Sequence, residues 1–219
     1  EITMEKKTDF KALPTKSKFQ YIWDYYRWHI IGTILVVGII TSLVYHYVTY
    51  QEPALNIIMI NSNHYEYTDM TPFDAYLEYA GIDPSESCVS FASTPYFGEN
   101  ATSSDTYTDY EVMGVQIATG SVDIFIGNGD IYTSYTDQGA LLDLSTVLSA
   151  DILERYADHL LYTTNGGESE AYPCAIEFTD DNWLTKQDYY STPCYVGIFA
   201  NCPNRENAVK FLQFLIEND

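Results

Sequence analysis

The stretch at residues 30–44, IIGTILVVGIITSLV, decides how the rest of this chain is organised. It consists almost entirely of Ile, Leu, Val and Gly, and no formal charge occurs from Trp28 to Gln51. A helix of about 20 apolar residues crosses the ~30 Å hydrocarbon core of a bilayer. The stretch therefore predicts one transmembrane signal anchor over residues 28–50, with the lipid bilayer as its partner.

The residues around this stretch predict its orientation. Aromatic rings flank it on both sides, as expected for side chains that sit at the two headgroup layers. Six of the ten Lys and Arg residues precede it, in a basic and aromatic segment over residues 1–27. By the positive-inside rule this segment is cytoplasmic. We therefore expect a single-pass protein of the cell membrane, with residues 51–219 forming an extracellular domain.

Three other interpretations of the apolar stretch fit less well. A core helix of a soluble protein would carry a polar face over this length. A cleaved signal peptide needs small residues before the cut, but here the apolar run continues into YHYVTY at residues 45–50. A lipoprotein needs a Cys directly after the run, and the first Cys is Cys88.

The charge of residues 51–219 is strongly negative. They hold four Lys/Arg against 27 Asp/Glu, a formal charge of −23. A field of this sign repels nucleic acid and anionic lipid, so we expect no nucleic-acid partner. The chain contains 21 Tyr and its aromatic content is 16%, which excludes a disordered segment.

Residues 51–219 read as alternating strands and helices. Short apolar runs at 54–60, 87–91 and 122–126 predict strands. The sequence Thr71-Pro72-Phe73-Asp74 predicts a helix start, and Gly81 a helix end. A second helix over 109–119 is expected to bury Val112, Met113 and Ile117. Alternating units of this size predict an α/β fold, with a mainly parallel sheet and helices on both faces.

The remaining elements follow from turn and capping signals. One or two helices are expected after residue 144. A hairpin is predicted from 161–164 and 171–176, turned by Asn165-Gly166-Gly167. A strand over 195–200 leads to a helix capped by Asn204. Its apolar face is Ala208, Phe211, Leu212 and Leu215.

Two passages carry a resemblance to a known family. The first is SVDIFI at 121–126 with Tyr132, Tyr135, GAL at 139–141 and DL at 143–144. The second is VGIFANCPNRENAVKFL at 196–212. Both are similar to segments of the extracellular solute-binding proteins of ABC importers. The resemblance implies capture of a small molecule, sugar or peptide, and a link to an importer. Two-lobed members are much longer than the about 170 residues here, which implies a single lobe or a reduced two-lobe form.

The predicted ligand site lies where the strands end. Open α/β sheets bind ligands at the carboxyl ends of their strands. Gly127-Asn128-Gly129 follows one strand, but the third Gly of a dinucleotide fingerprint would fall at Tyr132, so no nucleotide is expected. The residues expected to line the rim are Asn61, Ser62, Thr94, Tyr96, Asn128, Asp130 and Tyr132.

The sequence offers no pattern for catalysis, a cofactor or a metal. Residues 105–111 alternate acids with polar residues but lack the Gly of a calcium-binding loop. His29 and His46 belong to the ends of the anchor, so only His64 and His159 remain. The run Asp180-Asp181-Asn182-Trp183 either caps a helix or binds a cation, and capping is the favoured interpretation.

The four cysteines leave two alternatives. Cys174 and Cys194 lie at comparable ends of two predicted strands and could form a disulfide in an oxidising compartment. Buried thiols are the other alternative.

Two functions remain open at this stage. One is a solute-binding-protein-like domain on a membrane anchor. The other is a non-catalytic subunit that docks on a larger membrane assembly and binds no small ligand.

Overall fold

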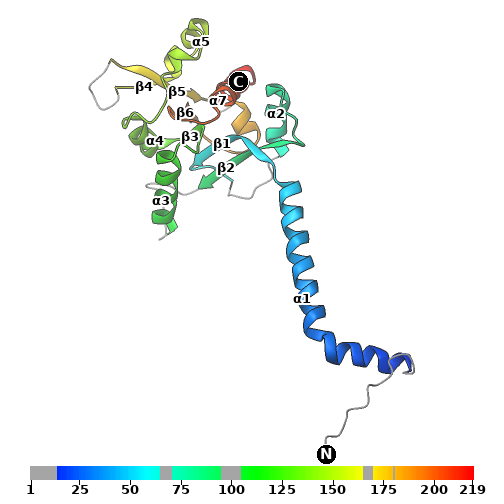
Figure 1. Cartoon of the computed structure of the whole chain (residues 1–219). Helices are drawn as coiled ribbons and strands as arrows, with labels where there is room; N and C mark the ends of the chain where they lie inside the picture. Colours follow the sequence, from blue (N-terminus) through cyan, green and yellow to red (C-terminus); the bar gives the residue numbers. More distant parts are fainter. Residues whose placement is uncertain (1–13, 65–70, 95–104, 165–169, 180) are drawn as a thin grey trace, which may run out of the picture. The chain divides into compact units, whose positions relative to one another are not determined.

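The computed structural model describes residues 14–64, 71–94, 105–164, 170–179 and 181–219 (Figure 1). The chain forms two compact units, Glu1–Tyr50 and Gln51–Asp219. The second unit begins at Gln51, the first residue after the predicted anchor over residues 28–50.

The described part of the first unit is one helix, α1, over Thr15–Thr49. Within it, Tyr25–Thr49 is long and apolar enough to cross a membrane, and none of that window is buried. This length and composition fit a membrane span and a signal sequence alike. Thr33, Thr41 and Thr49 donate their hydroxyls to carbonyls four residues earlier, at 2.8, 2.8 and 2.7 Å. These hydroxyls therefore need no partner from outside the helix.

The second unit is built on a six-stranded sheet in the order β2-β1-β3-β6-β5-β4. The strands are β1 (Glu52–Ile60), β2 (Ser87–Thr94), β3 (Ile124–Gly127), β4 (Leu160–Thr163), β5 (Tyr172–Phe178) and β6 (Cys194–Ile198). β1 lies between β2 and β3 and is parallel to both. The next strand in the sequence, β2, therefore lies on one side of β1, and the one after it, β3, lies on the other side.

The sheet is mixed, so the prediction of a mainly parallel sheet is wrong for the second half. The pairs β3–β6, β5–β6 and β4–β5 are all antiparallel. The predicted hairpin of β4 and β5 forms as expected. The described residues between β5 and β6 form one helix, the four-residue α6 (Trp183–Lys186). A helix that short rises about 6 Å, so it does not span the sheet as the crossover helix of a parallel pair does, and β6 runs antiparallel to β5.

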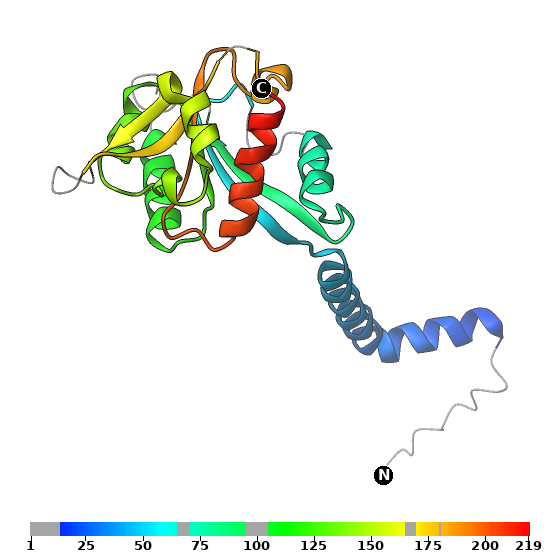
Figure 2. The same cartoon turned by 90° about the horizontal axis from the view of Figure 1, so that it is seen from above.

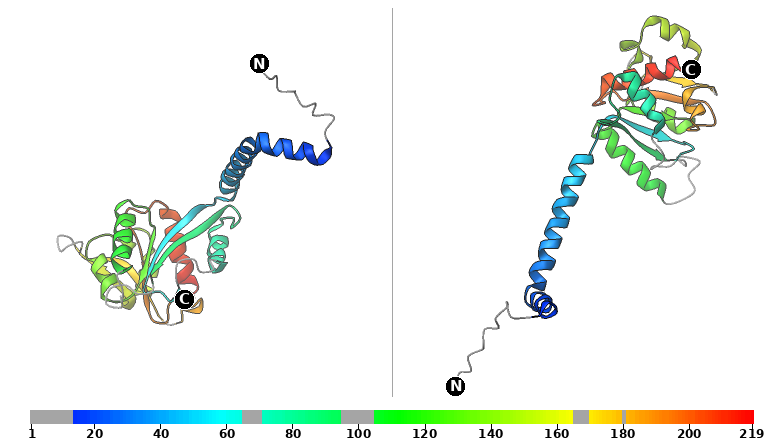
Figure 3. Two further views of the ribbon diagram at one scale, coloured as in Figure 1. Left: turned by 90° about the horizontal axis from the view of Figure 1, so that it is seen from below. Right: turned by 90° about the vertical axis from the view of Figure 1, so that its right-hand side faces the viewer.

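Helices cover both faces of the sheet, as predicted (Figure 3, right). One face packs against α2 (Asp74–Ala80), α6 and α7 (Arg205–Glu217). The other packs against α3 (Asp105–Ala118) and α4 (Gly129–Thr136). Short elements complete the first layer: η2 (Thr71–Phe73), η4 (Leu144–Thr146), α5 (Ala150–Arg155) and η5 (Ala157–His159).

The predicted helix signals hold at most positions. Gly81 ends α2 in the left-handed region at φ 74°, which glycine adopts without strain. All four apolar residues predicted for α7 are buried. On α3, Met113 is buried and Ile117 packs against the core, but Val112 is 49% exposed. The expectation for Val112 is therefore wrong. The face of α3 that packs on the sheet is narrow and does not include every apolar residue of the helix.

Two short helices, α4 and α6, each begin after an Asn residue. α4 begins at Gly129, one residue after β3 ends at Gly127. α6 follows Asn182, whose side-chain oxygen accepts from the amides of Leu184 at 2.7 Å and Thr185 at 3.2 Å. Asn182 therefore acts as a helix cap, the favoured interpretation of the run at 180–183.

Candidate functional site

The carboxyl ends of β1 and β3 form the topological switch point of the sheet. The strands that follow β1 in sequence lie on opposite sides of it. In open α/β sheets ligands bind in the crevice outside such neighbouring strand ends. Here those ends are Ile60 and Ile126-Gly127. A Cβ at Gly127 would collide with the side chain of Ile60, so glycine permits the close approach of the two strands.

Tyr190 occupies this switch point. Its side chain is 2% exposed. Its hydroxyl lies 2.9 Å from the carbonyl oxygen of Ile60 and 3.2 Å from that of Ile126. One phenol therefore lies within hydrogen-bonding distance of a carbonyl near the end of each strand. Burial raises the pKa of Tyr190 well above its ordinary value, so the hydroxyl keeps the proton that it donates.

Residues 188–192, which we call the plug segment, are fastened on both sides of Tyr190. Asn63 donates its backbone N–H to the carbonyl of Tyr189 at 2.8 Å. The Asn63 amide also donates to the Ser191 hydroxyl at 2.8 Å. On the other side the Asn128 amide donates to Thr192 at 3.0 Å. The loops after β1 and β3 thus hydrogen-bond to the plug segment of the same chain.

Tyr189, next to Tyr190, anchors the plug segment in the core. Its ring lies 4.9 Å from His64 and 5.4 Å from Phe73, centroid to centroid. It also stacks on Trp183 at 6.0 Å. Aromatic pairs at these separations add to the free energy gained by burial. Segment 188–192 is therefore held by packing as well as by hydrogen bonds.

The structure brings together three of the seven residues predicted for the rim. Asn61, in the left-handed region at φ 55°, and Ser62 follow β1, and Asn128 follows β3. Ser62 is 2% exposed and its hydroxyl oxygen accepts from the amide of His64 at 3.1 Å. Ser62 therefore bonds to His64 inside the protein, and Asn128 bonds to Thr192.

Of the other four predicted residues, the structure describes the side chain of Tyr132 alone. Tyr132 is fully buried, stacks on Phe125 at 4.4 Å, and donates its hydroxyl to the Phe125 carbonyl at 3.2 Å. It is a core residue. Asp130 lies in the first turn of α4 and Thr94 ends β2, and their side chains are outside the described part. Tyr96 lies outside the described residues altogether.

The sequence reading missed a buried carboxylate at the opposite end of β3. Asp123 is fully buried. Its oxygens accept from the backbone amides of Asn56 at 2.8 Å and Asn204 at 2.7 Å, and from the Asn204 side chain at 3.0 Å. Donors from β1 and from the start of α7 therefore compensate its burial. One sequence feature could have revealed this carboxylate: an acid stands directly before the apolar run IFI, with no Lys or Arg nearby in the sequence.

The cysteines carry free thiols, and Cys174 and Cys194 are not brought together. Cys194 pairs with Phe178 across β5 and β6, so Cys174 lies four residues further along β5. At about 3.3 Å per residue this is ~13 Å, beyond the ~7 Å that a disulfide spans. The buried-thiol alternative describes both residues. Burial raises the pKa of each to about 12, which makes them poor nucleophiles.

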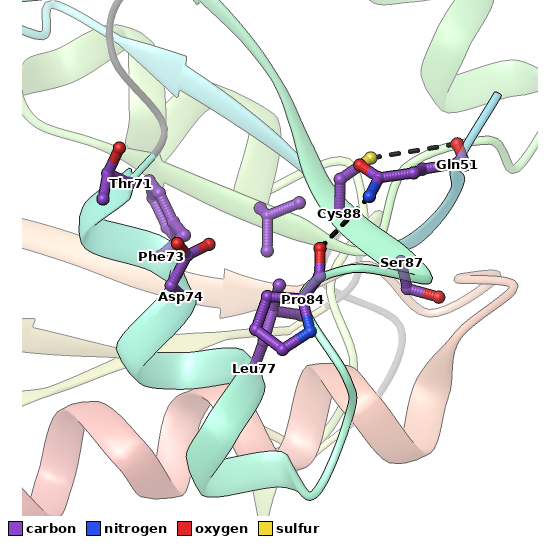
Figure 4. A pocket seen from close by; sticks show the side chains of 9 residues that line it. Gln51, Thr71, Phe73, Asp74, Leu77, Pro84, Ser87 and Cys88 are labelled. Atoms are coloured by element: carbon purple, nitrogen blue, oxygen red, sulfur yellow. Dashed lines mark hydrogen bonds between the residues drawn. The ribbon is translucent and has the colours of Figure 1, made fainter. Parts of the chain in front are cut away.

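A cavity of about 230 Å³ lies between α2 and β2, away from the switch point (Figure 4). The Gln51 amide at its edge donates to the carbonyls of Pro84 at 3.1 Å and Ser85 at 2.8 Å. Burial raises the pKa of Cys88, so its thiol is not activated. Asp74 supplies a carboxylate, and no general base is paired with a nucleophile among the described lining residues. Nor do the described residues include a group of three His, Cys, Asp or Glu that could hold a metal ion.

Comparisons of the chain with protein-family models, curated proteins and solved structures find no match.

Proposed function

We propose that this chain is a membrane-anchored, non-catalytic interaction subunit, whose domain outside the cytoplasm binds a protein partner. The observation that carries the proposal is the position of Tyr190. Its hydroxyl bonds to Ile60 and Ile126 and fills the crevice where a sheet of this topology would take a small ligand.

The anchor rests on α1. Its window Tyr25–Thr49 has no buried side chains, unlike a core helix. Trp and Tyr stand at its start and Tyr at its end, where a membrane has its headgroups. The excess of Lys and Arg before residue 28 favours a cytoplasmic N-terminus, and hence a domain outside the cytoplasm.

The two edges of the sheet support partner binding at β2. The edge strand β4 has four residues, and one register shift occurs in each edge pair, β4–β5 and β1–β2. Short strands protect an edge from pairing. The other edge strand, β2, has eight residues, SCVSFAST, with no charge and no proline. Such an edge accepts an additional strand through its backbone groups.

The charge of the domain indicates which partner fits this edge. Two copies would each bring a formal charge of −23 and repel one another. A neutral or basic extended segment of another membrane protein meets no such repulsion. We therefore assign β2 to strand addition by a segment of that kind.

The solute-binding interpretation makes a different structural demand. It requires residues 188–192 to leave the switch point, which breaks the bonds of Tyr190, Asn63 and Asn128 described above. It also requires the domain to enclose a ligand without a second lobe, because Gln51–Asp219 is one compact unit.

Two edge variants of the full-length chain test the proposal. Ser90 is exposed on β2 and Tyr162 is 51% exposed on β4. Each is replaced by Lys, which discourages strand addition at an edge. After mild detergent extraction from the native membrane, we expect wild type and Y162K to co-purify with an integral membrane protein in fixed stoichiometry. S90K should lose that partner while keeping the same unfolding midpoint.

A ligand screen gives the opposing outcome. If a sugar, peptide or amino acid stabilises the full-length chain by a kcal/mol or more, and equally in S90K, the interaction proposal is wrong. In that case the solute-binding interpretation replaces it.

A further inference from the structure

The first turns of α1 lie outside the part of the helix that fits a membrane. Tyr25–Thr49 has 25 residues and a rise of about 37 Å, close to the thickness of a bilayer with its interfaces. The whole of α1 has 35 residues and would extend about 52 Å if straight. About ten residues at its start therefore need another location.

The direction of α1 changes near this point. In Figure 1 and Figure 2 its first turns, drawn in the darkest blue, run at a steep angle to the longer remainder. The backbone stays helical throughout. We call residues 15–24, TKSKFQYIWD, the leading leg.

The sequence of the leading leg is amphipathic at helical spacing. At 100° per residue, positions 19, 22 and 23 (Phe, Ile and Trp) share one arc of about 100°. Thr15, the first residue of the helix, also falls within this arc. The opposite side holds Ser17, Gln20, Tyr21 and Asp24. Lys16 and Lys18 stand at the two borders of the apolar arc. Lysines at such borders can bury their stems and extend the ammonium to the headgroups.

We propose that the leading leg lies in the plane of the cytoplasmic membrane surface and binds anionic phospholipid headgroups through Lys16 and Lys18. An amphipathic helix with basic residues beside its apolar face takes this position. The partner is the bilayer that the adjoining span would cross, so the leg continues the same contact. This inference rests on the proposed membrane anchoring.

Nitrogen-15 NMR of the full-length chain in oriented bilayers tests it. In bilayers containing phosphatidylglycerol, the amides of residues 16–23 should show the shifts of a helix parallel to the surface. The amides of residues 30–44 should show those of a transmembrane helix. The double variant K16Q/K18Q, or a pure phosphatidylcholine bilayer, should lower the in-plane to mobile signal ratio about tenfold, because each lysine near an anionic surface contributes to binding.

The experiment has one control variant and three outcomes that would contradict the proposal. K186Q/K210Q removes the same charge from the outer domain and should leave the ratio unchanged. In-plane signals that persist in K16Q/K18Q and in phosphatidylcholine would overturn the headgroup assignment. Transmembrane or mobile signals from residues 16–23, with residues 30–44 still transmembrane, would overturn the in-plane position. Loss of the transmembrane signal at 30–44 would instead overturn the anchoring.

Discussion

The two ends of β3 are closed by buried groups of opposite character. At the carboxyl end a neutral phenol, Tyr190, donates toward carbonyl oxygens of β1 and β3. At the amino end a carboxylate, Asp123, accepts from the amides of Asn56 and Asn204. Both closures join β1 to segments far along the chain, one ahead of β6 and one at the start of α7.

This difference follows from the chemistry of strand ends. Parallel strands leave carbonyls without partners at one end and N–H groups at the other, and buried groups of either kind need partners. A donor therefore suits one end and an acceptor the other. The donor end is the one where a ligand would bind in this topology, and here the chain supplies its own hydroxyl.

The largest effect is expected from Asp123→Ala. The change leaves two partly buried backbone N–H groups and the Asn204 amide without an acceptor, so the free energy of unfolding should fall by roughly 3 kcal/mol. Urea unfolding of the full-length chain in detergent measures it. Asp181→Ala, at a carboxylate that is 95% exposed, is the control and should change nothing. Equal stability of the two variants would refute the role given to Asp123.

Tyr190→Phe should have a smaller effect. The ring still fills the switch point, but the carbonyls of Ile60 and Ile126 lose their donor, which costs about 2 kcal/mol. The same urea titration measures this change. Tyr162→Phe removes a hydroxyl from a ring that is 51% exposed and should be neutral. A neutral Y190F would mean that this hydroxyl is not held between the strands.

Alkaline pH should weaken the fold through groups that are buried in their protonated form. Cys174 and Cys194 have pKa values of about 12 in the folded chain, against about 8.5 for free Cys. The folded state then binds more protons than the unfolded state, so stability falls as pH rises from about 9 toward 12. Each thiol contributes about 1.4 kcal/mol per pH unit in that window. Urea midpoints at pH 8, 9 and 10 test the slope, and a flat profile would contradict it.

The smallest effect is expected from loss of the hydrogen bond that holds the plug segment at Thr192. The hydrogen bond between Asn128 and Thr192 is 3.0 Å long and exposed, so N128A should lose only about 0.5–1 kcal/mol. A double-mutant cycle with T192V isolates the pair. Coupling near zero would show that this bond does not hold the plug segment.

The sequence predicted the elements whose signals are local. The strand at 54–60, the helix start at Thr71, the hairpin and the apolar face of α7 all depend on neighbouring residues, and all are present. The antiparallel direction of β6 was missed because it depends on how far the chain travels after β5. Tyr132 was placed on the rim because its position after a strand end gave no measure of burial.

The closure by Tyr190 lay beyond sequence reasoning for a similar reason. The phenol is 130 residues from Ile60 and 64 from Ile126. Nothing in the run DYYST distinguishes a plug from a surface loop. Asn128 was correctly placed at the strand ends, but its partner is Thr192 and not an external ligand.

Tyrosine NMR of the full-length chain tests the central claim, that Tyr190 closes the switch point, most directly. The ring carbon bonded to oxygen is labelled with carbon-13, and the Tyr190 signal is assigned by its absence in Y190F. The structure predicts that this signal stays at its protonated position as pH rises past 10, where free tyrosine ionises, until the chain unfolds. Ionisation of Tyr190 near pH 10 in the folded chain would place its hydroxyl in water and contradict the closure.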